Sequence, residues 1–368
     1  MRAPRPTTTA ALRGSLPAAS LDARAIGRLA KNPQCQRLAG LTLVGSSPGK
    51  AMEHVFAPGF EEKQSKFAIA KGTRFERVQV EHGGARLIAS LQEAGILGPQ
   101  DVSFRNIEAE TAHIRNPVAA KQRAMVLTDE ILRRKAAGDP TAPVLVYQAA
   151  LGVPLGSGEI ACVRPDLLLA RPDQPMYGPG ELKSYAYLHH LTDRHDVGQA
   201  ASQMGVYGMA LERRLEHLRL SRPVPTQGAL VLVRPGGLQS VAQLQNIERD
   251  MSIARRIIDV RPRTLAEVAA VIGHGNTLDH APAIMRLRPC YSGKCRAFCA
   301  LHDVCRGEAT ATGNPAILGD ETEAMLAAAG CDLSRAAELL RGAPPATPEE
   351  ADLQRKLQKL DAEWRAAS

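Results

Sequence analysis

The chain has 368 residues, of which 44% are hydrophobic, and its mean hydropathy is −0.18. These values fit a globular protein, and no apolar run approaches the length of a membrane-spanning helix, so we expect a cytoplasmic protein without membrane contact. Lys and Arg total 46 against 38 Asp and Glu, which gives a net charge of +8. A basic balance suits a polyanionic partner but does not by itself establish one.

The N-terminal third is expected to be mostly helical. Residues 1–19 are rich in Thr, Ala, Arg and Pro and lack the apolar core of a secretory signal, so we expect a disordered leader. Residues 20–140 form the N-terminal helical part. Ser20-Leu21-Asp22 can cap a helix to about Lys31, and further helices are expected over about 65–95, interrupted at Gly83-Gly84, and over about 118–136.

Residues 141–260 combine strand and helix patterns. Strands are expected over residues 142–149, 163–169, 180–184 and 228–233, and helices over about 240–260 and over the stretch that carries His195, Gln199, Gln203 and Tyr207. The turn-forming residues at 171–180 would pair the second and third of these strands as a hairpin. This order predicts an α/β fold with a mixed sheet flanked by helices.

Charged residues stand on the two strands of that hairpin. Asp166 opens the first strand, and Glu181 and Lys183 leave the same face of the second because they are two residues apart. Two carboxylates can hold Mg²⁺ or Mn²⁺, and a lysine beside them can orient or deprotonate an attacking water. The alternative is a half-exposed hairpin with ordinary surface charges.

The helix that follows carries a polar stripe. His195, Gln199, Gln203 and Tyr207 recur every four residues, and amide and phenol donors suit a phosphate backbone. A polar cluster overlaps the start of this helix, and we interpret it as a loop bordering the cleft, with a second metal site as the alternative: His189, His190, Asp193, His195 and Asp196.

Together these motifs resemble the PD-(D/E)xK nucleases of the RecB type. The resemblance is carried by Pro165-Asp166, Glu181-Leu182-Lys183 and Gln203-Met204-Gly205-Val206-Tyr207. It implies a restriction-endonuclease-like sheet, metal binding by Asp166 and Glu181, a catalytic role for Lys183, and assistance at the DNA or the active site by Gln203 and Tyr207. Glu76, four residues after Gly72, stands where that family usually has a histidine, and it would be a third metal ligand.

Residues 261–310 contain a cysteine cluster. Cys290, Cys295, Cys299 and Cys305 lie within sixteen residues, whereas the whole chain has seven cysteines. The odd number and the lack of an export signal argue against disulfides, so the cluster indicates zinc or iron–sulfur, with reduced core cysteines as the alternative. No spacing is the Cys-x-x-Cys usual for zinc.

The resemblance extends to these cysteines. RecB-like nucleases of the AddB and CRISPR-associated types hold a [4Fe–4S] cluster with one cysteine ahead of the core and three behind it. This implies Cys35, Cys295, Cys299 and Cys305 as ligands, and a structural clasp between the first and last parts of the chain. Zinc stays an alternative, as does Cys290 in place of Cys295. Two further cysteines are expected in the core: Cys162 and Cys331.

The C-terminal part, residues 311–368, is expected to be helical over about 320–330, 332–340 and 347–366. Thr347-Pro348-Glu349-Glu350 reads as a capping box that starts the last helix. The only tryptophan, Trp364, would dock this helix on the rest of the protein.

The sequence therefore predicts a Mg²⁺- or Mn²⁺-dependent deoxyribonuclease, an exonuclease on single-stranded or unwound ends. Its partners would be DNA and a separate helicase or a CRISPR or repair protein, and its pathway could be CRISPR spacer acquisition, DNA repair or phage defence. Two alternatives stay open: a DNA-binding scaffold with a degenerate site, and a zinc-clasped protein-interaction module.

Overall fold

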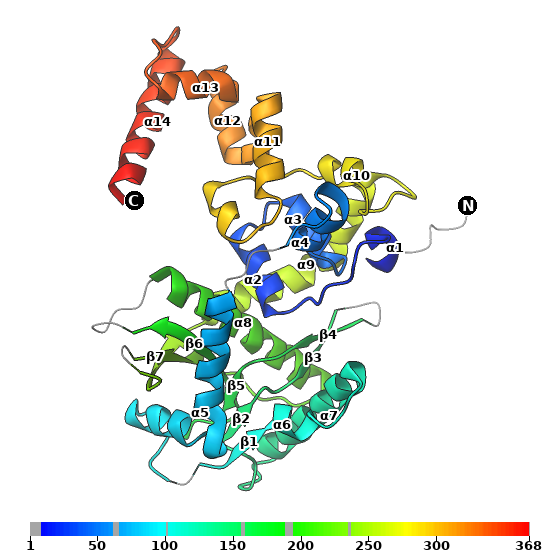
Figure 1. The fold of residues 1–368 in the computed structure, drawn as a ribbon, viewed down its shortest axis with the longest axis vertical. Helices are drawn as coiled ribbons and strands as arrows, with labels where there is room; N and C mark the ends of the chain where they lie inside the picture. The colour runs from blue at the N-terminus through cyan, green and yellow to red at the C-terminus, as the bar shows by residue number, and fades with distance from the viewer. Residues whose placement is uncertain are drawn as a thin grey trace. The chain divides into compact units, whose positions relative to one another are not determined.

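The computed structural model describes residues 9–61, 66–100, 102–155, 159–187, 194–234 and 237–367 (Figure 1). The chain forms two compact units. The sheet unit comprises Ser20–Ala30 and Lys63–Pro262, and the cysteine unit comprises Met1–Ala19, Lys31–Glu62 and Arg263–Ser368. The expected boundary at residue 140 is absent from this division, because the helices before it pack on the sheet.

The sheet unit has the mixed α/β class predicted from the sequence. A six-stranded sheet has the order β1-β2-β5-β6-β7-β8, and β3 and β4 form a separate pair. The strands are β1 Phe104–Asn106, β2 Leu145–Tyr147, β3 Leu151–Pro154, β4 Ile160–Val163, β5 Leu167–Leu169, β6 Gly178–Ala186, β7 Gln227–Val233 and β8 Ser240–Asn246.

The sheet unit also contains helices. They are α2 Ala23–Lys31, α5 Lys66–Glu93, α6 Ile107–Thr111, α7 Pro117–Ala136, α8 Arg194–His217 and the first part of α9 Glu248–Ile272. Figure 1 shows α5 crossing the strands, where Phe75 and Leu91 pack with Leu182 and Val231. Met204 of α8 lies over Gly228, so α8 covers the opposite face, which the even-numbered residues of β7 form.

The predicted hairpin is confirmed. β5 and β6 pair antiparallel, with Leu167 opposite Gly180, and β6 then pairs parallel with β7, with Glu181 opposite Leu230. A Cβ atom at residue 180 would lie only 3.1 Å from both Leu167 Cβ and the carbonyl oxygen of Ala229. Glycine at this position therefore lets the three strands approach closely.

The structure confirms one detail of the expected helices and contradicts another. The predicted interruption of the 65–95 helix is confirmed, since residues Glu81 to Gly84 have non-helical backbone angles. The predicted helix over 240–260 is wrong at its start, because Ser240–Asn246 is strand β8, paired along its whole length with β7. The first residues of β8 alternate between buried and partly buried, which is the period-two pattern of a strand. The helical spacing of the charged residues after residue 248 led us to extend the helix back over this strand. Strands β1, β3 and β4, of three or four residues, were not predicted.

The cysteine unit is helical. Its elements are α1 Thr9–Arg13, α3 Gln36–Leu43, α4 Pro48–Ala51, the π-helix η1 Met52–Phe56, α9 from Arg263, α10 Ala281–Arg286, the 3₁₀-helices η2 Gly293–Ala297 and η3 Pro315–Leu318, α11 His302–Thr312, α12 Asp320–Ala328, α13 Leu333–Leu340 and α14 Pro348–Ala367. The expectation of a disordered leader is wrong for residues 9–19. Leu12 and Leu16 are buried in the core of this unit, and the backbone N–H of Ser15 donates to Asp279 (2.8 Å).

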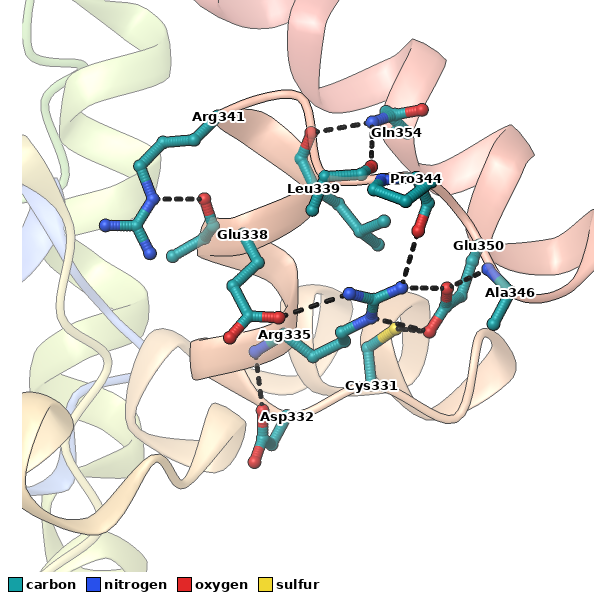
Figure 2. A network of polar contacts seen from close by, with 12 residues as sticks. Cys331, Asp332, Arg335, Glu338, Leu339, Arg341, Pro344, Ala346, Glu350 and Gln354 are labelled. Carbon is teal, nitrogen blue, oxygen red and sulfur yellow. Dashed lines mark hydrogen bonds and ion pairs between the residues drawn. The ribbon is translucent and has the colours of Figure 1, made fainter.

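The C-terminal helices are held by a polar network (Figure 2). Arg335 on α13 forms a bidentate ion pair with Glu350 on α14, at 2.9 and 2.6 Å. Thr347 caps α14 as predicted, while the Glu350 carboxylate accepts from the N–H of Ala346 instead of from that of Thr347. Cys331 is buried here, as expected. The side chain of Trp364 lies outside the described residues, and no described helix is long and apolar enough to cross a membrane.

Candidate active site and cysteine cavity

A cleft of about 560 Å³ opens within the sheet unit, between β4, β6 and the helices α2, α5, α7 and α8. Its lining includes all six residues predicted for catalysis or divalent-metal binding: Glu76, Asp166, Glu181, Lys183, Gln203 and Tyr207. Of the polar cluster predicted ahead of α8, His195 and Asp196 lie in the first turn of α8 instead of in a loop, whereas residues 188–193 and the side chain of His195 lie outside the described part of the chain.

Asp166 is held in a fixed orientation just before β5. Its Oδ2 accepts from the backbone N–H of Leu182 (3.0 Å), and its Oδ1 accepts from the side-chain amide of Gln148 (3.3 Å). Burial and the negative charge of Glu181 raise the pKa of Asp166 well above its usual value, and Lys183 only partly opposes the shift. The site therefore disfavours the charged carboxylate unless more positive charge is added.

Glu181 has one oxygen without a partner. The residue is 1% exposed, and its Oε1 forms an ion pair with Lys183, but Oε2 is buried without a hydrogen-bond partner among the described residues. An unsatisfied buried carboxylate oxygen is unfavourable by about 1–3 kcal/mol or more. This oxygen points to a missing donor or cation, so the donor set fits a hard divalent ion.

Lys183 and Glu76 complete the charged group. Burial alone would lower the Lys183 pKa, but Glu181 and Asp166 outweigh burial and raise it, so the amine is charged at neutral pH. Burial raises the pKa of Glu76, where Glu181 acts in the same direction and Lys183 against it. The carboxylate of Glu76 is therefore within electrostatic reach of the pair on β6.

Gln203 and Tyr207 are one turn apart on α8 and face this group. Tyr207 is buried, and burial together with the charges of Glu181 and Asp166 raises its pKa well above the usual value. Its phenol is thus a neutral donor beside the Glu181 carboxylate. The predicted stripe on α8 places these two side chains in the cleft.

Other residues that line the cleft or contact Asp166 were not predicted to do so. Gln148, which holds Asp166, has a positive φ of 52°, a strained conformation that no sequence pattern announces. Cys162 was expected in the core but is half-buried and lines the cleft. Three cations also line it: Arg24, Lys121 and Arg164. Of these residues, only Arg164 could have been expected near the cleft from the sequence, because it lies two residues before Asp166.

A small cavity in the cysteine unit collects the clustered cysteines. Its lining includes the four predicted ligands and the fifth cysteine of the cluster: Cys35, Cys290, Cys295, Cys299 and Cys305. Cys35 comes from the N-terminus of α3, and the others come from the segment between α10 and the first turns of α11. Cys35 and the other cysteines are thus far apart in the sequence but line the same cavity within one unit.

Nitrogen donors surround two of the sulfurs. Cys295 Sγ accepts from Asn32 Nδ2 (3.6 Å) and the backbone N–H of Ser292 (3.5 Å), and Cys305 Sγ accepts from Arg37 Nη1 (3.3 Å). Such donors favour thiolate over thiol and are typical of cysteine ligands of iron–sulfur clusters.

Burial opposes that preference. It raises the pKa of Cys35 and Cys305, and it raises that of Cys299 to about 12. Without a cation the thiols of Cys35, Cys299 and Cys305 are protonated at neutral pH, and a metal group would displace the protons as it bound. The thiols together with the N–H donors fit a metal group held by thiolates.

Hydrogen bonds join the two chain segments that surround this cavity, residues 32–37 and residues 284–290. The N–H of Gln36 donates to the carbonyl of Arg288 (2.9 Å), the N–H of Arg288 donates to Gln36 Oε1 (3.1 Å), and Asn32 Nδ2 donates to the carbonyl of Cys290 (2.6 Å). Arg37 is almost fully buried and donates to the carbonyls at the end of α10. The cysteine segment is therefore positioned partly without metal.

No group of three or more His, Cys, Asp or Glu in the described residues is arranged to hold a metal ion. No protein-family model and no curated protein matches the chain. A solved structure, described as "Crystal structure of SSO0001", matches 48% of this chain and 83% of that one, at 15% identity and a TM-score of 0.19. A similarity this low supports no conclusion about fold or function.

Proposed function

We propose that the sheet unit is a metal-dependent deoxyribonuclease with a restriction-endonuclease-like core of the RecB type. The observation that supports this most is the cleft itself, in which Asp166 and Glu181 lie with Lys183 and one buried carboxylate oxygen has no partner in the described part of the chain. Burial and Glu181 raise the pKa of Asp166, and a bound cation would favour its charged carboxylate over the protonated form.

The carboxylates would hold Mg²⁺ or Mn²⁺, which often takes one or two protein carboxylates and completes its shell with waters and substrate phosphate. Asp166 and Glu181 are the two ligands, and Glu76 is the third candidate. When bound, the ion supplies Lewis-acid activation of the scissile phosphate and of a water.

The remaining residues act on the substrate directly. The charged amine of Lys183 orients the attacking water and offsets the charge that develops on the phosphate oxygens. Gln203 and the neutral phenol of Tyr207 donate hydrogen bonds to the phosphate or orient Lys183. We propose exonuclease action on single-stranded or unwound ends, with a separate helicase or a CRISPR or repair protein as partner.

An end-labelled single-stranded oligonucleotide tests this function. We expect cleavage by the wild type with Mn²⁺ or Mg²⁺, none in EDTA, and none by Asp166→Ala. Asp173→Ala is the matched control, because Asp173 belongs to the same hairpin but pairs with Arg171 at its exposed turn. Equal cleavage by the Asp166 and Asp173 variants would refute the assignment.

We further propose that Cys35, Cys295, Cys299 and Cys305 hold a structural [4Fe–4S] cluster, with Cys290 as the alternative to Cys295 and zinc as the alternative metal. The supporting observation is that the thiols line one cavity with N–H donors directed at two sulfurs. Iron with a visible absorption band supports the cluster, and zinc without that band supports the alternative.

One observation favours a second candidate function, a DNA-binding scaffold with a degenerate site. Glu76 stands where the resembling nucleases usually have a histidine. The same oligonucleotide assay separates the two functions, because a scaffold would bind the strand in the presence of Mn²⁺ and release no product.

A further inference from the structure

Three cationic side chains line the cleft and have no role in the proposed cleavage step. Arg24 lies on α2, Lys121 lies on α7, and Arg164 follows β4. All three residues are exposed. Within the described residues, none of these three side chains forms a hydrogen bond or an ion pair.

Several other arginines of the sheet unit form ion pairs with nearby carboxylates. Arg134 forms an ion pair with Asp139 (2.7 Å), and Arg214 forms a bidentate pair with Asp129. The contrast matters because cations near three carboxylates would be expected to pair with them if the geometry allowed. Their positions leave them available to a ligand of negative charge.

The cations form two groups on separate walls. Arg24 stands on the wall formed by the start of α2, which also lines the cleft through Asp22 and Ala23. Burial raises the pKa of Cys162, and Lys121 and Arg164 oppose that shift, so these two lie together beside β4.

A nucleic acid strand needs such an arrangement to reach the carboxylates. Its phosphates are repelled by Glu76, Asp166 and Glu181, and backbone affinity comes mainly from contacts between phosphates and Lys or Arg. The cleft volume of about 560 Å³ falls within the range of roughly 300–1,000 Å³ for ligand pockets.

We propose that Arg24 on one wall, and Lys121 with Arg164 on the other, bind the two phosphates of a single DNA strand that flank the phosphodiester at Asp166 and Glu181. This inference rests on the proposed nuclease function. The strand would be held at three successive phosphates, so the central linkage is placed in register by contacts on both sides.

Methylphosphonate interference tests the arrangement by binding alone. A fluorescent single strand carries one neutral methylphosphonate, moved one position at a time, and its affinity is measured by anisotropy with Ca²⁺ present. The proteins compared are the wild type, Arg24→Gln, the double variant Lys121→Gln/Arg164→Gln, and Arg123→Gln. Arg123 is the matched control because it is exposed on α7 two residues from Lys121 and does not line the cleft.

We expect two positions, one on each side of a central phosphate, at which the neutral linkage weakens wild-type binding. Arg24→Gln should make one of these positions insensitive, and the double variant should make the other insensitive. Each variant should also reduce the slope of log affinity against log salt by about 0.7, because the protein then neutralises one phosphate fewer. Arg123→Gln should match the wild type.

The inference is overturned if both variants keep both sensitive positions, or if they bind no more weakly than Arg123→Gln. Failure of the nuclease function gives a different result: the two-position pattern would persist while the wild type released no product with Mn²⁺. Thermal unfolding of each variant is measured as well. An unfolding midpoint equal to that of the wild type excludes misfolding as the cause of weaker binding.

Discussion

The acidic cleft and the cysteine cavity present the same physical problem in different forms. In the cleft, burial and mutual repulsion raise the pKa of Asp166, and one oxygen of Glu181 has no partner among the residues that the structure describes. In the cavity, burial raises the pKa of Cys35 and Cys299. Both sites disfavour their own anions, and a bound cation would reverse that in each.

The two sites differ in access and in ligand type. The cleft is wide, carries oxygen ligands and is bordered by exposed cations, which suits an exchangeable ion that meets a phosphate. The cavity is small, carries sulfur ligands and is enclosed by donors such as Asn32 and Arg37. We therefore expect a permanently bound metal group in the cavity and an exchangeable metal ion in the cleft. Four predictions test this difference between the two sites.

The largest effect is expected from the cavity. Cys299→Ser should abolish the visible absorption band and iron content and sharply lower the thermal stability of the cysteine unit, because metal-binding energy is folding energy. Absorption, metal analysis and thermal unfolding are the measurements. Cys331→Ser is the control, since Cys331 is buried elsewhere in the same unit. A variant that kept its iron would remove Cys299 from the ligand set.

The next effect concerns the cleft alone. Lys183→Ala should reduce the cleavage rate by about 10²–10⁴-fold, while affinity for a single strand in Ca²⁺ changes only a few-fold. The residue is 16% exposed and sits on β6, so thermal unfolding must be compared as well. Near-normal cleavage would show that the amine has no part in the reaction.

A smaller effect tests the exchangeable ion. Mn²⁺ at about 100 times its dissociation constant should stabilise the wild type by about 2.7 kcal/mol and leave Asp166→Asn unchanged. Without metal, Asp166→Asn should be at least as stable as the wild type, because the folded-state pKa of Asp166 is raised and its charged form opposes folding. That difference should shrink as pH falls below the folded-state pKa. Thermal unfolding with and without Mn²⁺ measures both, and a metal response in the variant would contradict the assignment.

The smallest effect lies away from both sites, in the Arg335–Glu350 network. Hydrogen bonds from Arg335 and from the backbone N–H of Ala346 lower the pKa of the Glu350 carboxyl from 4.5 to about 2. A lowered pKa contributes stability above pH 4.5 that is lost as pH falls through about 2. Glu350→Gln should thus increase amide exchange in α13 and α14 at pH 7, with the difference shrinking toward pH 3. Glu338→Gln, at the exposed partner of Arg335, should change exchange less.

The parts of the fold that came from the sequence were those with strong local signals. The hairpin carrying Asp166, Glu181 and Lys183 followed from apolar runs and turn residues, and the break near Gly84 followed from paired glycines. These signals depend on neighbours in the chain, which is why they could be read without a structure.

The parts that failed depend on long-range packing. Residues 240–246 pair with β7 to form an edge strand, and residues 9–19 are held by burial of Leu12 and Leu16 against distant helices. The cations at Arg24 and Lys121 reach the cleft from helices whose own sequences give no reason to expect them there. Tertiary packing decides such positions, and single-sequence patterns do not contain it.

Metal analysis after dialysis against EDTA, followed by an electron paramagnetic resonance titration with Mn²⁺, tests the distinction between the two sites most directly. We expect the wild-type protein to keep its iron and its visible absorption band through dialysis and then to bind Mn²⁺ at the cleft. We expect Asp166→Asn to keep the iron but to lose that Mn²⁺ site. Equal Mn²⁺ binding by both proteins would contradict this expectation.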